Sequence, residues 1–201
     1  MRKIVVFTMV SLDGVMQAPG GPEEDPSGGF KYGGWTAPYA DKSFAKILSK
    51  ELSVPFDLLL GRKTYEIFAN YWPEQTGMVA DPFNKAKKYV VSGKGVDLTW
   101  EESILINGDV VAELKALKAE DGPVFHVWGS EKLVQTLFKN DLVDELRLRI
   151  YPVTLGRGKR LFAEGTIPAA FELIDSQALP SGVILANYKR AGEVKTGTVG
   201  E

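Results

Sequence analysis

A strand, a tight turn and a helix follow one another in residues 57–68, which read DLLLGRKTYEIF. The apolar run that starts at Asp57 stops at Gly61, and a helical pattern begins directly afterwards at Arg62. A strand that ends in a small or glycine-rich turn recurs near Ser92 and again near Gly129. Strands that alternate with helices in this way predict an α/β fold with a mainly parallel sheet.

The segments on either side fit the same architecture. Residues 4–10 are nearly all apolar, which is typical of a central strand covered on both faces. Residues 38–52 carry apolar side chains at helical spacing, and Thr36 is a plausible cap, so we expect an amphipathic helix there.

The C-terminal part of the chain follows a different pattern. Residues 145–151 alternate polar and apolar side chains, and two strand-like runs, 171–178 and 183–188, flank a short turn. We therefore expect one domain over residues 1–190: a mixed, mainly parallel sheet flanked by helices and closed by a C-terminal β-hairpin. Residues 191–201 have few large apolar side chains and are expected to form a frayed tail.

The composition excludes several functional classes. The chain has 201 residues, with 24 Lys+Arg against 26 Asp+Glu and a net charge of -2, so it lacks the overall basic charge of a nucleic-acid binder. It has no cysteine and one histidine, which excludes disulfides, thiol nucleophiles and multi-histidine metal sites. The absence of cysteine fits a cytoplasmic location, and no run approaches the roughly 20 apolar residues of a membrane helix.

Residues 18–34 are unusually rich in glycine and proline and cannot form a regular element. Loops of this kind often close over substrates, so we expect a mobile lid that a ligand orders. Phe30, Tyr32 and Trp35 are aromatic residues that could stack on a planar substrate ring or could pin the loop to the core.

The turns at the strand ends point to a ligand that contains phosphate. Open α/β sheets bind ligands beyond the carboxyl ends of their strands, where helix N-termini present unpaired N–H groups to anions. Gly129 would leave room for a pyrophosphate, and Arg62 could pair with a phosphate. Glycines after strands are also ordinary loop residues, and neither the P-loop nor the Gly-x-Gly-x-x-Gly pattern occurs, so these turns alone leave the ligand open.

Four stretches carry a resemblance to a known family. Residues 57–65, 127–130, 142–148 and 152–162 resemble the dihydrofolate-reductase-like family. They are more similar to its branch related to the C-terminal reductase domain of the bacterial bifunctional riboflavin-biosynthesis deaminase/reductase. The likeness covers about residues 2–190, and the last two stretches carry its most specific motif. A zinc deaminase domain of the kind fused to those relatives needs cysteine ligands, so deamination is excluded here.

The resemblance implies NADPH as the cofactor and hydride transfer to a small heterocyclic or carbonyl/imine substrate. It further implies that Arg62 favours NADPH over NADH by pairing with the 2'-phosphate. The residues implied to bind the cofactor lie in the strand-end turns and in one later loop. They are Gly61, Arg62, Lys63, Thr64, Ser92, Gly93, Gly129, Ser130, Glu131, Lys132, Leu133, Leu155 and Gly156.

The resemblance also implies a place for a catalytic acid. In dihydrofolate reductases an acidic residue follows a Trp and a Pro on the first helix, and Trp35 and Pro38 look like that pair. The equivalent position falls near Ala40, so the neighbouring Asp41 is the candidate acid, or else an exposed carboxylate at a helix start. Asp13 and Trp35 are the candidate substrate-binding residues. His126 lies within an apolar strand and is expected to be packed rather than catalytic.

Three functional hypotheses remain at this stage. The leading one is an NADPH-dependent reductase of a small molecule, acting as a homodimer, with no nucleic-acid or membrane partner. A second is the 5-amino-6-(5-phosphoribosylamino)uracil reductase of riboflavin biosynthesis. A third is a nucleotide-binding module without catalysis.

Overall fold

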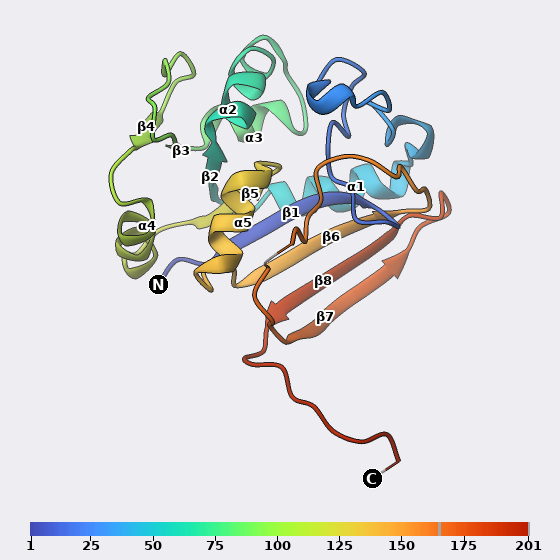
Figure 1. Ribbon diagram of the computed structural model, residues 1–201. Helices are drawn as coiled ribbons and strands as arrows, with labels where there is room; N and C mark the ends of the chain where they lie inside the picture. Colours follow the sequence, from blue (N-terminus) through green and yellow to red (C-terminus); the bar gives the residue numbers. More distant parts are fainter. Residues whose placement is uncertain (165, 201) are drawn as a thin grey trace.

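One eight-stranded sheet organises the molecule, as Figure 1 shows for the computed structural model, which describes residues 1–164 and 166–200. The strand order is β4-β3-β2-β5-β1-β6-β8-β7. Adjacent strands from β4 through to β6 are parallel, whereas β8 is antiparallel to both β6 and β7. The predicted mixed, mainly parallel sheet with a C-terminal hairpin is therefore confirmed. The strands are β1 (Ile4–Ser11), β2 (Phe56–Gly61), β3 (Lys88–Val91), β4 (Ser103–Ile106), β5 (Val124–Trp128), β6 (Glu145–Tyr151), β7 (Phe171–Ala178) and β8 (Ile184–Arg190).

Helices cover both faces of the parallel part of the sheet. The α-helices are α1 (Lys42–Leu52), α2 (Arg62–Ala69), α3 (Ala80–Lys85), α4 (Val110–Ala119) and α5 (Glu131–Lys139), and the 3-10 helices are η1 (Ser27–Gly29), η2 (Ala37–Tyr39) and η3 (Trp72–Glu74). One face packs against α4 and α5 through residues such as Leu114 and Leu137, and the other against α1, α2 and α3 through residues such as Leu52 and Phe83. Among the described residues, no helix is long and apolar enough to cross a membrane.

Strand β1 lies at the centre of the sheet, between β5 and β6, and is buried along nearly its whole length. After β1 the chain moves outward through β2, β3 and β4, and β5 then returns to the space between β2 and β1. The strand order reverses at this point, and a crevice forms beyond the carboxyl ends of the strands, where open α/β sheets bind their ligands.

The first α-helix begins later than the sequence pattern predicts. Residues 37–39 form the separate helix η2, and α1 starts at Lys42. Asp41 rather than Thr36 caps α1, because its carboxylate accepts a hydrogen bond from the Ser43 N–H at 2.5 Å. The Thr36 hydroxyl instead donates to the Pro19 carbonyl.

The C-terminal hairpin extends beyond the helical layers, and the chain leaves it at the bottom of Figure 1. Residues 191–200 contain no helix or strand in the structure, and their side chains are exposed. Leu173, Ile174 and Ile184 of the hairpin are large apolar side chains that are more than two-fifths exposed, at 49%, 45% and 44%.

His126 is a packed core residue, as expected. Its imidazole stacks on the Phe56 ring with centroids 4.3 Å apart and lies 4.4 Å from the Phe7 ring. Burial lowers its pKa to about 3, and the positive charge of Arg147 acts in the same direction. The imidazole is therefore neutral at physiological pH.

This burial predicts a specific pH dependence of stability. The unfolded chain binds a proton at His126 near pH 6.5, whereas the folded chain does not, so acidification favours unfolding below that pH. The slope approaches about 1.4 kcal/mol per pH unit. We expect the wild type to lose more stability between pH 7 and pH 5 than a His126→Phe variant, measured by urea unfolding. Equal losses in the two proteins would contradict the burial of a neutral imidazole.

Candidate active site

A cavity of about 640 Å³ opens at the carboxyl ends of the parallel strands. Its wall is built from the ends of β1, β2, β3 and β5, the first turns of α2 and α5, and part of the loop over residues 18–34. The cavity has two parts of different character. Polar turns form one part, and aromatic side chains form the other.

The turn between β5 and α5 presents free backbone donors. Gly129 and Ser130 both have left-handed backbone conformations, with φ of 64° and 63°. The Ser130 hydroxyl does not cap α5 and instead accepts a hydrogen bond from the Gly61 N–H at 2.8 Å. Because the Ser130 hydroxyl bonds to the other turn, the first N–H groups of α5 have no side-chain cap. They remain able to bind an anion.

The start of α2 adds cationic side chains and a second uncapped helix end. Gly61 occupies the cap position and makes no side-chain cap bond. Arg62 forms an ion pair of 2.7 Å with Glu66 one turn later, and both side chains are about half exposed. Thr64 lies across the turn from Gly129, where a Cβ on the glycine would be 3.6 Å from the threonine side chain.

The turn after β3 completes the polar part. The Ser92 hydroxyl donates to the Gly95 carbonyl at 2.7 Å and stabilises the turn, and Gly93 beside it is exposed. Lys94 also lines the cavity and is exposed, and it forms no ion pair within the described chain. Lys94 is not among the residues expected from the sequence, although its position between two glycines of a strand-end turn is a usable signal.

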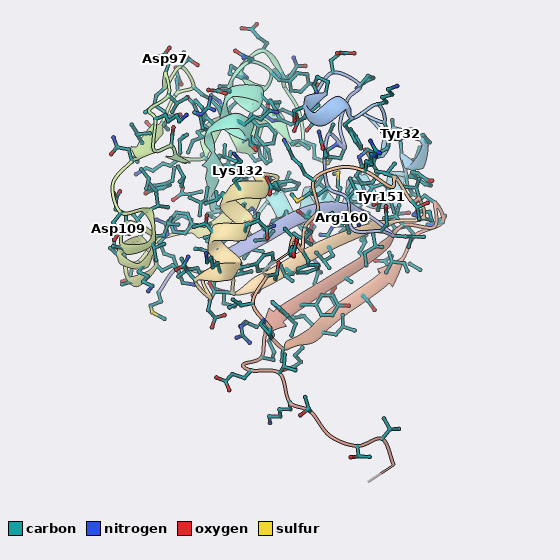
Figure 2. All side chains as sticks on the ribbon, viewed as in Figure 1. Tyr32, Asp97, Asp109, Lys132, Tyr151 and Arg160 are labelled. Carbon is teal, nitrogen blue, oxygen red and sulfur yellow. The ribbon has the colours of Figure 1, made fainter. Side chains whose placement is uncertain are left out.

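The predicted cofactor residues divide into two groups. Eleven of them line this cavity: Gly61, Arg62, Lys63, Thr64, Ser92, Gly93, Gly129, Ser130, Glu131, Lys132 and Leu133. Figure 2 shows Lys132 at the upper end of α5, where that helix begins. Leu155 and Gly156 do not line the cavity. Their backbone N–H groups donate instead to the Asp13 carboxylate, at 3.1 Å and 2.7 Å.

Asp13 consequently holds a loop together and does not face the cavity. Its carboxylate accepts a hydrogen bond from the Ser11 hydroxyl, which with the two amides of the 155–156 turn lowers the pKa of Asp13 to about 2. Its carboxylate therefore accepts from backbone amides in the structure, and its role in binding a substrate stays a prediction.

The two candidates on the first helical segment also lie outside the cavity lining. Asp41 caps α1, as described above, and this segment contributes Thr36 and Leu48 to the wall instead. The Trp35 indole N–H donates to the Gln17 carbonyl at 2.8 Å, and its ring packs edge-on against Tyr151 at 5.2 Å. Trp35 thus anchors the loop to the core, which is the second of the two roles considered for it.

Aromatic rings form the other part of the cavity, which we call the aromatic compartment: Phe7, Phe68, Trp72, Phe83 and Trp128, together with Leu48. The rings touch one another in series. Phe7 stacks on Trp128 at 4.8 Å and 9°, Trp128 meets Phe83 at 5.4 Å, and Phe83 meets Trp72 at 5.3 Å. Their residues come from β1, β5, α2, η3 and α3, so only the folded chain brings them together.

One buried carboxylate joins three walls of the cavity. Asp25, on the loop over residues 18–34, accepts from the Lys63 ammonium of α2 and from the Lys159 ammonium, both at 2.5 Å. Burial opposes its ionisation, but these hydrogen bonds hold the pKa of Asp25 well below its usual range. Gln17 donates to the carbonyls of Asp25 and Ser27 at 2.9 Å and ties the same loop from within. These contacts favour a fixed wall over the mobile lid expected from the composition.

A reductase of dihydrofolate-reductase-like fold is the class that this sheet order and this cleft fit. The family model for the RibD C-terminal domain matches residues 2–185, and the chain belongs to that family. This membership, together with the fold, supports an oxidoreductase.

Individual proteins are also similar to this chain, and the solved structures among them share its fold. The chain is 27% identical over 192 residues to the uncharacterized protein YyaP of Bacillus subtilis, covering 93% of this chain and 94% of that one. Among solved structures it is similar to a pyrimidine reductase-like protein from Corynebacterium diphtheriae, with a TM-score of 0.65, 15% identity, and 96% and 93% of the two chains covered. It is also similar to an Enterococcus faecalis dihydrofolate reductase complexed with NADP(H) and RAB-propyl, with a TM-score of 0.60, 15% identity, and 94% and 96% covered.

The Asp25 contacts predict how the loop over residues 18–34 behaves. In an Asp25→Asn variant the two lysines lose their anionic partner, so we expect amide hydrogens of this loop, such as that of Gly34, to exchange about tenfold faster or more. Hydrogen exchange with mass spectrometry measures this, and Glu23→Gln on the exposed side of the same loop is the control. Unchanged exchange in Asp25→Asn would show that the carboxylate does not hold the wall.

Proposed function

We propose that the protein is an NADPH-dependent reductase of a small planar heterocyclic or carbonyl/imine substrate. One observation carries this proposal: two uncapped helix N-termini and a third strand-end turn face one cavity, and an aromatic compartment adjoins them. Dinucleotides need N–H donors for their phosphates, and planar rings need flat apolar walls. The two halves of the cavity supply these separately.

The residues present fit the cofactor. The N–H groups at the start of α5, beside the glycine at position 129, would take the pyrophosphate, because neither a side chain nor a cap blocks them. Arg62, Lys94 and Lys132 supply the positive charge that the adenosine phosphate side requires. NADPH would contribute the hydride in this arrangement, and the protein would bind and orient it.

The substrate would lie in the aromatic compartment. Trp72, Trp128 and Phe68 line the cavity and are partly buried, so part of each ring is accessible from it. Stacking on such rings orients a planar acceptor and excludes water from it. Asp41 does not line this cavity, where the first helical segment contributes Thr36 and Leu48, and Glu24 is a carboxyl group that does line it.

Cofactor choice gives the direct test. Arg62→Ala should weaken NADPH binding by about 1.5–3 kcal/mol, the range for a hydrogen bond to a charged group, and weaken NADH binding much less. Fluorescence titration of both nucleotides measures this. Equal losses for the two nucleotides would remove the 2'-phosphate role from Arg62.

Glu66 provides a matched variant for the same experiment. Its exposed ion pair with Arg62 competes with a phosphate, and such pairs are worth about 0.3–0.5 kcal/mol. Glu66→Gln should therefore strengthen NADPH binding about twofold and leave NADH binding unchanged. A weaker affinity for NADPH in this variant would mean that the pair positions Arg62 instead of competing for it.

We also propose that the protein forms a homodimer through the β7–β8 hairpin. Leu173, Ile174 and Ile184 expose apolar surface on this hairpin. Burial of such surface against a second copy is favourable, at about 25 cal/mol per Å². Sedimentation equilibrium should give a dimer, and Ile174→Lys should shift it toward monomer. A wild-type protein that is monomeric at micromolar concentration would contradict this assembly.

A further inference from the structure

We propose that Glu24 is the proton donor of the reductase, and that its Oε1 atom passes a proton to the nitrogen or oxygen of the substrate bond that is reduced. The inference rests on the proposed function, since it assigns a catalytic residue to the same cavity. Three observations support it: the place of Glu24 in the cavity wall, the hydrogen bonds that leave one of its oxygens free, and the opposite state of the neighbouring carboxylate.

Glu24 lines the cavity as part of the glycine-rich loop that follows β1. The Gly20 N–H donates to its carboxyl group, and the preceding residue, Pro19, accepts from the Thr36 hydroxyl at 2.7 Å. Thr36 lines the same cavity, as does Leu48 of α1, which belongs to the aromatic compartment. Hydrogen bonds therefore connect the wall that carries Glu24 to the segment that leads into α1 and the compartment proposed for the substrate.

The two carboxyl oxygens of Glu24 have different surroundings. Oε2 accepts from the N–H groups of Gly20 and Gly21, at 2.6 Å and 3.2 Å. Oε1 makes no hydrogen bond with any residue that the structure describes, and it is not one of the enclosed polar atoms without a partner, so it keeps accessible surface. A proton on Oε1 leaves both N–H bonds to Oε2 intact, and the loop can therefore hold this carboxyl group in either protonation state.

The adjacent carboxylate, Asp25, is held in the ionised state. Burial opposes its ionisation, but hydrogen bonds from Lys63 and Lys159, both at 2.5 Å, and from the Ser27 hydroxyl at 2.6 Å hold the pKa of Asp25 well below its usual range. Burial instead raises the pKa of Glu24, and the charge of Asp25 acts in the same direction, against the two N–H groups. Neighbouring carboxyl groups whose pKa values are moved apart are typical of a site in which one group holds a proton and the other stays ionised.

The other charged residues of the cavity have different positions or partners. Lys159 donates to Asp25, and the rest lie in the strand-end turns and first helical turns that are proposed to bind the cofactor. Among the described residues, no histidine or tyrosine lines the cavity. Besides Glu24 and Asp25, the charged lining residues are Arg62, Lys63, Lys94, Glu131, Lys132 and Lys159.

The reduction balances with one proton from Glu24. The carbon of the C=N or C=O bond receives a hydride from the reduced nicotinamide, and the electron pair of the π bond moves to the nitrogen or oxygen. That atom takes the proton from Oε1, which forms an N–H or O–H bond and leaves a carboxylate. Glu24 regains a proton from water before the next turnover. Proton donation of this kind accelerates a reaction about 10²–10⁴-fold.

A kinetic test uses isatin, a planar heterocycle with a ketone carbonyl, together with NADPH. Glu24→Gln keeps the size of the side chain and removes the acid, so kcat should fall at least about 100-fold while the KM for isatin changes less than about threefold. A general acid must be protonated, so kcat/KM of the wild type should fall by up to about tenfold per pH unit from about pH 5.5 to about pH 8. Glu24→Gln should lose this dependence, and Glu23→Gln, on the exposed side of the same loop, should behave as the wild type.

A titration of the carboxyl group itself does not depend on turnover. The full chain labelled with [5-13C]glutamate, with and without NADP+, should show one carboxyl resonance that titrates above the usual range of glutamate and is absent from Glu24→Gln. Asp25→Asn removes the adjacent negative charge, so the midpoint of this resonance should move to lower pH. Circular dichroism and thermal unfolding establish that the variants are folded.

The outcomes separate this proposal from the proposed function. Failure to bind NADPH would overturn the proposed function. Equal isatin reduction by the wild type and Glu24→Gln, or titration of Glu24 within or below the usual range, would overturn the proton donor and leave the reductase intact. If a protein that binds NADPH does not reduce isatin, the carboxyl titration decides: a raised midpoint that Asp25→Asn lowers supports the proposal, and any other midpoint overturns it.

Discussion

The return of β5 to the space between β1 and β2 determines where everything else in the cavity lies. Parallel pairing of β5 with both neighbours brings the carboxyl ends of three strands together, and α2 and α5 begin directly beyond two of them. Trp128 at the end of β5 thereby stacks on Phe7 of β1, and Gly129 reaches Thr64 of α2. The end of β5 therefore lies between the polar part and the aromatic part of the cavity.

Hydrogen bonds between segments then decide which groups remain available to a ligand. The Ser130 hydroxyl accepts from the Gly61 N–H and leaves the start of α5 uncapped, whereas the Asp25 carboxylate accepts from both Lys63 and Lys159 and offsets part of their charge. The Asp13 and Asp41 carboxylates likewise accept hydrogen bonds from backbone N–H groups. A carboxylate that accepts backbone N–H groups at a turn or a helix start is stabilised as a structural anion.

The polar part of the cavity is formed by backbone groups of short turns, and the aromatic part is formed by side chains from several elements. Phosphate binding depends on backbone donors at helix starts, which any short turn with glycine can present. Ring binding depends on side-chain faces, which come here from five elements that are far apart in the sequence. Variation in η3 and α3 can therefore change the aromatic part of the cavity without altering the residues of the strand-end turns.

The sequence by itself determined the alternation of strands and helices, the central position of β1, the C-terminal hairpin and the three turns at the strand ends. These features follow from local periodicity and from glycines at turns, which depend on neighbours only a few residues away. Only the tertiary structure decided that Asp25 joins its loop to two lysines, that Asp41 is a cap and that Trp72 and Trp128 meet through Phe83. The partners of these side chains lie up to 134 residues away, as Lys159 does from Asp25. Local sequence patterns cannot predict which distant charge or ring a side chain will contact, because that contact depends on how the whole chain folds.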